Sequence, residues 1–472
     1  MDKINNLKLW CIFFFYTFCV SAFVQFVLLP YVFPGLHAGS GLLICSFDSI
    51  GFHKLALESA NKIHAQGWSA WQLKPEGHVV SGIASIFYVF LPNARILIPL
   101  NAALHASAAL VLVNLLDLFI NNKFKSILCA LPFLVFPSNL QWTAQLHKDI
   151  FSVLGVVMLL YGLVSLVKLA SNKAVSWFSI SFYSIIFCIC GFILLWLVRS
   201  YMLMIVMPFV ISFFSILFLV LFIRAFKKDI SWHKTALILL DMLFILLISA
   251  QLHPADLKKS VVSAQFHAEK SSVQNISSTI ESPIVVEADA GTIIEKNNID
   301  MCWKRSSWLP LFIDRNACHL AIIRRGFRGS APEARSNIDC DIGFGNAKDM
   351  LIYLPRAAQI AFLAPFPTQW FSEGTYRGSY LMRRVASYEM MVVYFALLFL
   401  PCAIWRWRKR AEIWTIFAFC VYMMLIYGLT ISNIGTLYRM RYPYITTLVA
   451  LGIAGFTVFL DSLKIKKKQK AE

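Results

Sequence analysis

Three acidic residues outside the apolar runs of the chain are the first candidates for chemistry. Asp48 follows the first apolar run, Glu76 lies later in the same polar stretch, and Asp149 ends the triplet His147-Lys148-Asp149 before another apolar run. A carboxylate beside a hydroxyl group can act as a general base. Three acids from separate stretches therefore predict an acid–base site, with Asp48 as the base and Asp149 assisting it or positioning the acceptor.

Each acid also has a plainer structural explanation. Asp48 is a favourable N-cap for a helix that would begin at Ser49. His147-Lys148-Asp149 can be a helix cap followed by an apolar helix, with the lysine reaching to the membrane surface. If the triplet acts in chemistry, we expect His147 and Lys148 to contact phosphate.

Arginines and tyrosines between later apolar runs form a second group of candidates. Arg199 and Tyr201 stand between two apolar runs, and Tyr438, Arg439 and Arg441 lie in the short connector before the last run. The planar guanidinium group matches the oxygens of a phosphate and stays charged at any relevant pH. These residues therefore predict a phosphate site. The alternative is that the arginines reach lipid head groups.

The composition shows which elements must position these residues. Of 472 residues, 58% are hydrophobic and 14% are charged, which is typical of a protein whose solvent is a membrane. Apolar runs of about 17 to 25 residues recur, each long enough to cross the bilayer as a helix. We expect an all-α polytopic membrane protein with about ten spans. They lie near residues 9–33, 96–120, 125–140, 151–170, 177–197, 202–224, 235–252, 386–405, 412–431 and 443–461.

Positive charge is distributed so that it predicts the orientation. The net charge is +18, and lysines and arginines gather in every second connector, which places both termini in the cytoplasm and argues against a nucleic-acid partner. Arg383 and Arg384 are the exception. The first apolar run lacks a small-residue cleavage site, so we expect a retained helix. The basic residues assigned to the inner side are Lys3, Lys8, Lys123, Lys125, Lys168, Lys173, Arg224, Lys227, Lys228, Lys234, Arg406, Arg408, Lys409, Arg410 and the tail from Lys464 to Lys470.

Two long segments on the opposite side divide the chain. We expect an N-terminal transmembrane module over 1–251 with an outer loop at 34–93, a periplasmic loop domain over 252–385, and a C-terminal module over 386–472. In the first loop, 48–66 is helix-compatible and 78–91 is half apolar. In the second, the Ser- and Val-rich part at 272–290 favours a flexible or strand-forming excursion, and the proline-interrupted stretch 350–371 is expected at the membrane interface.

The second half of the large loop carries positive charge that the orientation does not explain. Seven basic residues lie between Lys304 and Arg335. They predict an anionic ligand, or contacts with lipid head groups. A disulfide between Cys302 and Cys318 would stiffen this segment in an oxidising compartment. No zinc-ligand spacing, P-loop or dinucleotide fingerprint occurs, which argues against nucleotide chemistry.

The motifs together resemble the GT-C superfamily of membrane glycosyltransferases, particularly the bacterial relatives of protein mannosyltransferases and lipid A aminoarabinose transferases. The likeness lies in Asp48 within a large first loop, in the run from Phe136-Pro137-Ser138 to Asp149, and in the run from Tyr438 to Pro443. It covers roughly the first 225 and the last 90 residues. Asp48 stands alone where family members often carry adjacent acids, and a basic pair precedes Asp149.

The resemblance implies a fold and a reaction. It implies a GT-C-like enzyme that transfers a sugar, with inversion, from a polyprenyl-phosphate or polyprenyl-diphosphate carrier to a glycan, lipid or protein acceptor in cell-envelope polysaccharide assembly. The reaction would take place on the periplasmic side of a bacterial inner membrane. The implied partners are the lipid-linked donor, the acceptor and membrane lipids. No cofactor is certain, and a divalent cation is left open.

Three other functions remain as alternatives. An O-antigen polymerase or ligase also has many spans, a large outer loop and outer arginines, but relies less on an aspartate. A flippase or transporter would show charges deep within spans and a two-fold repeat, and neither was noted in this sequence. A non-catalytic scaffold would place no demand on the outer arginines.

Overall fold

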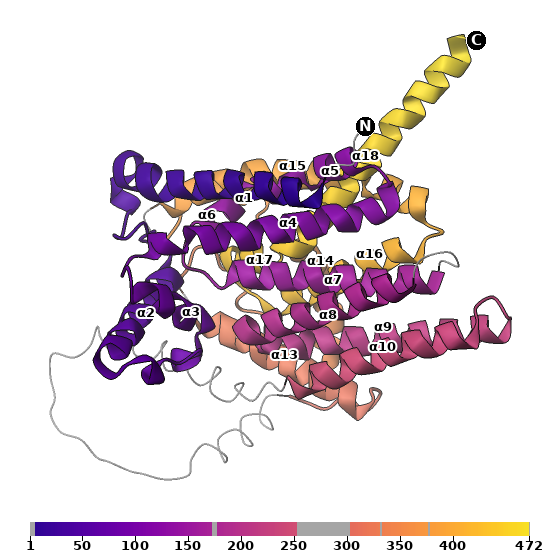
Figure 1. Cartoon of the computed structure of the whole chain (residues 1–472), viewed down its shortest axis with the longest axis horizontal. Helices are drawn as coiled ribbons and strands as arrows, with labels where there is room; N and C mark the ends of the chain where they lie inside the picture. Colours follow the sequence, from indigo (N-terminus) through magenta and orange to yellow (C-terminus); the bar gives the residue numbers. More distant parts are fainter. Residues whose placement is uncertain (1–4, 172–176, 253–302, 331–332, 376–377, 472) are drawn as a thin grey trace.

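The computed structural model describes residues 5–171, 177–252, 303–330, 333–375 and 378–471. In these ranges the chain is helical and forms a bundle of long helices that run side by side (Figure 1). Nine helices of the described ranges are long and apolar enough to cross a membrane. The expectation of an all-α, multi-pass membrane protein is therefore confirmed.

The spanning helices come from both ends of the chain. In the N-terminal part they are α1 (Asn6–Phe23) with its π-helical continuation η1 (Val24–Val32), α4 (Ile98–Ile120), α7 (Asp149–Ser171), α8 (Trp177–Arg199), α9 (Tyr201–Phe226) and α10 (Trp232–Gln251). In the C-terminal part they are α15 (Ser379–Trp407), α16 (Ala411–Thr430) and α18 (Tyr442–Ala471).

The expected span at 125–140 is wrong as a continuous helix. The chain forms α5 (Lys123–Val135), breaks at Phe136, and starts again as α6 (Pro137–Thr143). A proline disfavours the α conformation in the residue before it, and Phe136 has a ψ of 120°. Pro137 then occupies the first turn of α6, where its missing N–H group removes no helical hydrogen bond. Neither piece is long enough to span alone.

The two short helices nevertheless return the chain to the other end of the bundle (Figure 1). The connectors between α4 and α5, between α9 and α10, and between α15 and α16 then lie at the same end as both termini. These connectors carry the basic residues expected on the inner side. The end at which they gather is shown, and its cytoplasmic orientation stays a prediction.

Two helices fold over the opposite end of the bundle. They are α2 (Phe47–Gln66) and α3 (Val79–Tyr88), which confirms the helix expected at 48–66. Ser46 occupies the N-cap position of α2, so Asp48 lies in the first turn and the N-cap explanation for it is wrong. Phe52 and Ala56 of α2 pack with Ala84 of α3 in one buried cluster.

The described part of the large loop also forms helices. They are α13 (Leu311–Ser330) and α14 (Ala347–Leu363). The stretch at 350–371 is thus mostly helix, and its position at the membrane interface stays a prediction. One face of α14 packs on α16, where a Cβ on Gly428 would lie 2.2 Å from the carbonyl oxygen of Ala357. The serine-rich part at 272–290 and Cys302 lie outside the described residues, so the disulfide with Cys318 also stays a prediction.

Small residues let α15 and α18 approach closely. A Cβ on Gly452 would lie 2.0 Å from the carbonyl oxygen of Ala396, and one on Gly455 would lie 2.2 Å from that of Phe399. Where lipid surrounds the helices, close backbone contact of this kind drives association more than burial from water does. Gly452 and Gly455 therefore allow the tight contact between the two helices.

We expect Gly452→Ala to destabilise the protein because its methyl group forces α15 and α18 apart. Gly51→Ala is the matched control, since a Cβ at Gly51 in α2 has no other atom within 4 Å. Thermal unfolding of the purified proteins in detergent should show a loss of about 1–3 kcal/mol for Gly452→Ala. The control should be neutral, or more stable by up to about 1 kcal/mol. Equal stability of the two variants would contradict the packing.

Candidate functional site

Charged residues from four separate segments meet at the end of the bundle covered by α2. The segments are the first turn of α2, the loop before α7, the end of α8 and the short helix α17 (Ile434–Met440). Their interactions form what we call the acid–arginine cluster, which consists of Asp48, His147, Lys148, Asp149, Arg199 and Arg439. It joins residues almost 400 positions apart in the sequence, since Arg439 and Asp48 are separated by 391 residues.

The break between α5 and α6 leads to a buried loop that carries part of this cluster. Two amide side chains from spanning helices bind its backbone. Asn101 donates to the carbonyl oxygens of Thr143 and Gln145 at 2.9 and 3.0 Å, and Gln25 donates to that of Ala144. The Gln145 side chain donates to Gly41 at 3.0 Å. Non-helical backbone is tolerated at membrane depth only when it is satisfied in this way.

Asp149 and Arg199 form the buried part of the cluster. Nη2 of Arg199 donates to Oδ1 of Asp149, and each side chain is only 6% exposed. Asp149 also lies in the first turn of α7, where the helix dipole favours a negative charge. A buried ion pair is costly to break from one side, because the remaining charge loses its partner. This pair therefore fixes the ends of α7 and α8 against each other.

Asp48 and Arg439 form the accessible part of the cluster. Nη1 of Arg439 lies 3.2 Å from Oδ2 of Asp48, and the two side chains are 25% and 49% exposed respectively. The same Nη1 lies 3.8 Å from Oδ2 of Asp149. Arg439 thus bridges the accessible acid and the buried one.

The charge of Asp48 is controlled by its surroundings. Burial raises the pKa of Asp48, but the guanidinium group of Arg439 and the other basic groups nearby outweigh this and hold the pKa below its usual value. Asp48 is therefore ionised at neutral pH. It can bind a cation or accept a proton, but as long as Arg439 is paired with it, it is a weak base.

His147 is neutral in this environment. Burial lowers the pKa of His147 to about 4, so it cannot supply the positive charge expected for phosphate binding at pH 7. Its Nε2 lies 2.8 Å from the hydroxyl of Ser46, which ties the loop to the start of α2. Burial also lowers the pKa of Lys148, whose Nζ lies 5.8 Å from the ring centre of Phe52.

Two of the expected site residues lie outside the cluster. Glu76 is exposed in a short turn at Pro75–Gly77 and forms no ion pair with any described residue. Arg441 is 1% exposed, and it donates to the carbonyl oxygens of Ala361 at 2.6 Å and of Ala364. These carbonyls lie at the end of α14, where a helix leaves its last acceptors unpaired. The structure thus assigns Arg441 to holding α14 and removes it from the expected phosphate site.

The two expected tyrosines have different surroundings. Tyr201 begins α9, two positions after Arg199, and lies beside the buried part of the cluster. The hydroxyl of Tyr438 donates to Glu389 at 2.5 Å, so it does not point at the acid–arginine cluster.

The sequence analysis missed Glu389 of α15. This acid is 3% exposed and accepts from both the N–H group and the hydroxyl of Ser138, at 2.7 and 2.6 Å. With Tyr438 as its third donor, it ties α6, α15 and α17 together. Its signal in the sequence was an acid inside an apolar run.

Glu389 and Asp241 also correct an earlier inference. Asp241 is buried within α10 and accepts from the hydroxyl of Ser181 in α8. The spans therefore do contain acids, and the expected lack of deep charge no longer argues against a transporter. Both acids are hydrogen-bonded to neighbouring helices, which is the arrangement of a structural tie.

The site was also compared with metal centres and with known proteins. Within the described residues, no group of three or more His, Cys, Asp and Glu side chains is placed to hold a metal ion. No protein family, curated protein or solved structure matches the chain. The likeness to the GT-C superfamily therefore depends on the motifs alone.

The two halves of the cluster should respond differently to loss of an arginine. Arg199→Met leaves Asp149 buried without its main partner, so we expect a loss of about 3–5 kcal/mol in the free energy of unfolding. Arg439→Met removes a partly exposed pair and should cost about 1 kcal/mol or less. Thermal unfolding of both purified variants in detergent measures the difference.

A double variant provides the control for this comparison. Adding Asp149→Leu to Arg199→Met removes the unpaired charge and should restore part of the lost stability. If Arg439→Met is the more damaging single change, the division into a buried tie and an accessible pair is wrong.

Proposed function

We propose that this chain is a membrane glycosyltransferase that moves a sugar from a polyprenyl-phosphate or polyprenyl-diphosphate carrier to an acceptor hydroxyl, on the periplasmic side of a bacterial inner membrane. The observation that carries this proposal is the meeting of Asp48 and Arg439, both partly exposed, at the end of a bundle of spanning helices. A lipid-linked phosphate needs a cation at that depth, and the attacking hydroxyl needs a base beside it.

The chemistry follows from these two groups. The acceptor oxygen attacks the anomeric carbon of the sugar, and the bond from that carbon to the carrier phosphate breaks with its electron pair going to the phosphate. Arg439 stabilises the negative charge that develops on the leaving phosphate. Asp48 takes the proton of the attacking hydroxyl. Attack on the face opposite the leaving group inverts the anomeric centre.

Pairing of Asp48 with Arg439 couples donor binding to the activation of the base. In the free protein Arg439 holds the pKa of Asp48 low. A donor phosphate that binds Arg439 competes with Asp48 for the guanidinium group and weakens this effect. The pKa of Asp48 then rises, so the carboxylate becomes a stronger base once the donor has bound. This order would limit the attack of water before the acceptor arrives.

The buried pair would act on the reaction through position. Asp149 lies close to Arg439 and is fixed by Arg199, so it restricts where the guanidinium group of Arg439 can lie. Proper placement of a catalytic group can contribute several kcal/mol to the reaction barrier. Asp149 and Arg199 are thus positioning residues in this proposal, and Asp48 and Arg439 are the catalytic ones.

Substitution of Asp48 tests the proposal. Purified protein in detergent is given a panel of polyprenyl-phosphate and polyprenyl-diphosphate sugars with radiolabelled sugar, together with a membrane extract as acceptor. We expect transfer by the wild type and at least a hundredfold lower rate, as about the lower end of general-base effects, for Asp48→Asn. Release of the sugar-free carrier should fall in parallel.

Glu58→Gln is the matched control, because Glu58 is exposed on the same helix α2 and should leave the rate unchanged. Both variants should unfold at the wild-type temperature within a few degrees, since Asp48 is half exposed. Full activity of Asp48→Asn in cells would contradict the proposal and favour an O-antigen polymerase or ligase.

The pH dependence gives an independent check on the pairing. The base must be ionised, so kcat/KM should fall when the pH drops through the pKa of Asp48 in the free enzyme. Arg439→Gln removes the charge that lowers this pKa, so the acidic limb of the profile should move to higher pH. Lys54→Gln, which removes an exposed charge on α2, should leave the limb in place. An unmoved limb in Arg439→Gln would rule out Asp48 as the group that titrates.

A further inference from the structure

A second basic site lies on α13, outside the acid–arginine cluster. Arg324 of this helix is 1% exposed and donates to three backbone carbonyls, those of Ile342 at 2.9 Å, Asp339 at 2.8 Å and Leu429 at 3.0 Å. Leu429 belongs to the end of α16 from which α17 follows. Arg324 is therefore used to join α13 and the segment after it to the end of a spanning helix.

Two further arginines of α13 are not used in this way. Arg325 is exposed and donates to no described residue, and Arg328 donates only to the carbonyls of Cys340 and, at 3.3 Å, Asp341. Neutral carbonyls do not balance the charge of a guanidinium group. A Cβ on Gly343 would lie 2.8 Å from Nη1 of Arg328, so the glycine leaves room for this side chain.

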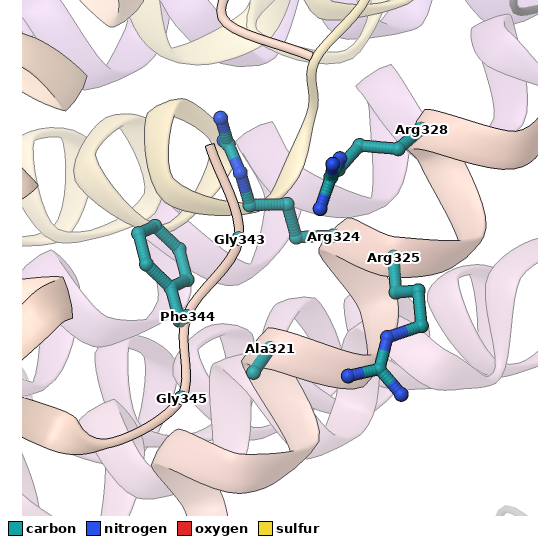
Figure 2. A pocket seen from close by; sticks show the side chains of 7 residues that line it. All are labelled: Ala321, Arg324, Arg325, Arg328, Gly343, Phe344 and Gly345. Carbon is teal, nitrogen blue, oxygen red and sulfur yellow. The ribbon is translucent and has the colours of Figure 1, made fainter. Parts of the chain in front are cut away.

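All three arginines line one pocket with a volume of about 270 Å³ (Figure 2). Figure 2 shows Arg328 reaching from α13 toward Gly343, while Arg325 extends from the same helix on the side of Ala321. The lining contains no acidic residue and consists of Ala321, Arg324, Arg325, Arg328, Gly343, Phe344 and Gly345. Like charges gathered in one pocket without a counter-charge favour a bound anion.

The neighbouring hollow has a different character. It has a volume of about 470 Å³, shares Gly343 and Phe344 with the arginine pocket, and is lined further by side chains that include Ile352 and Tyr353. Its two acids are already engaged. Asp339 accepts from Arg356 at 3.0 Å, and Asp349 accepts from the N–H group of Gly345 at 2.8 Å.

Exposed apolar side chains of α14 lie beside these hollows. Ile352 is 69% exposed and lines the second hollow, and its neighbour Leu351 is 55% exposed. The surface thus combines a basic pocket with an apolar ledge at the end of a spanning helix. An anion that carries an apolar tail matches both parts, whereas a free anion or a sugar matches only the pocket.

We propose that the Arg325–Arg328 pocket binds the phosphate of an anionic membrane lipid, whose acyl chains lie against Leu351 and Ile352. The guanidinium groups donate to the phosphate oxygens. Because Arg324 joins this region to the end of α16, a bound lipid would also stabilise the segment that leads to Arg439 in α17. The proposal does not depend on the glycosyltransferase function.

Thermal unfolding of the full-length protein in mixed micelles tests the proposal. The temperature of unfolding is followed while phosphatidylglycerol or phosphatidylcholine is added, and an apparent Kd is taken from the shift. We expect phosphatidylglycerol alone to stabilise the wild type. Arg325→Gln with Arg328→Gln should raise its apparent Kd at least about tenfold, as loss of charge-assisted hydrogen bonds implies.

Three controls make the result decisive. Arg315→Gln removes an exposed charge from the same helix and should change the apparent Kd less than about twofold, since exposed charges act weakly at a distance. If it weakens binding as much as the double variant, the attraction is diffuse and the pocket is not the site. If inorganic phosphate alone gives the whole stabilisation, the pocket takes a free anion and the lipid proposal fails. Should the double variant not fold, Arg325→Gln alone decides the question.

Discussion

The structure depends on how it satisfies a piece of non-helical backbone inside a membrane protein. The loop before α7 is buried, and water is not available there to bind its N–H and C=O groups. Gln25 and Asn101, from two spanning helices, donate to its carbonyl oxygens instead. The loop is thereby held in one conformation, and the cluster residues His147, Lys148 and Asp149 are held with it.

The two ion pairs of the cluster divide the tasks of stability and chemistry between them. Asp149–Arg199 is buried, so its charges are strongly coupled and it fixes two spanning helices. Asp48–Arg439 is accessible, so water and ligands compete for its charges and it can open when a phosphate binds. Arg439 approaches both acids. A rigid pair beside a responsive one is an arrangement in which a substrate can change the charge of a base without loosening the fold.

Arginines on the same side of the bundle have very different roles. Arg324 and Arg441 are each 1% exposed and bind backbone carbonyls at the ends of α16 and α14 respectively, so both are parts of the framework. Arg325 and Arg439 remain accessible. The difference comes from the positions of neighbouring helix ends, because the unpaired carbonyls there attract whichever guanidinium group lies within reach.

The sequence by itself determined the membrane class, most of the spanning helices and the set of polar connectors, because hydrophobic length and charge asymmetry are local properties of the chain. It also identified Asp48, Asp149, Arg199 and Arg439 as candidates. Only the tertiary structure decided which of the candidates meet. The break at Phe136 and the capping role of Arg441 depend on how distant helices pack, and the same holds for the ties of Glu389. Burial, and with it the choice between framework and reactive site, is a property of the assembled bundle.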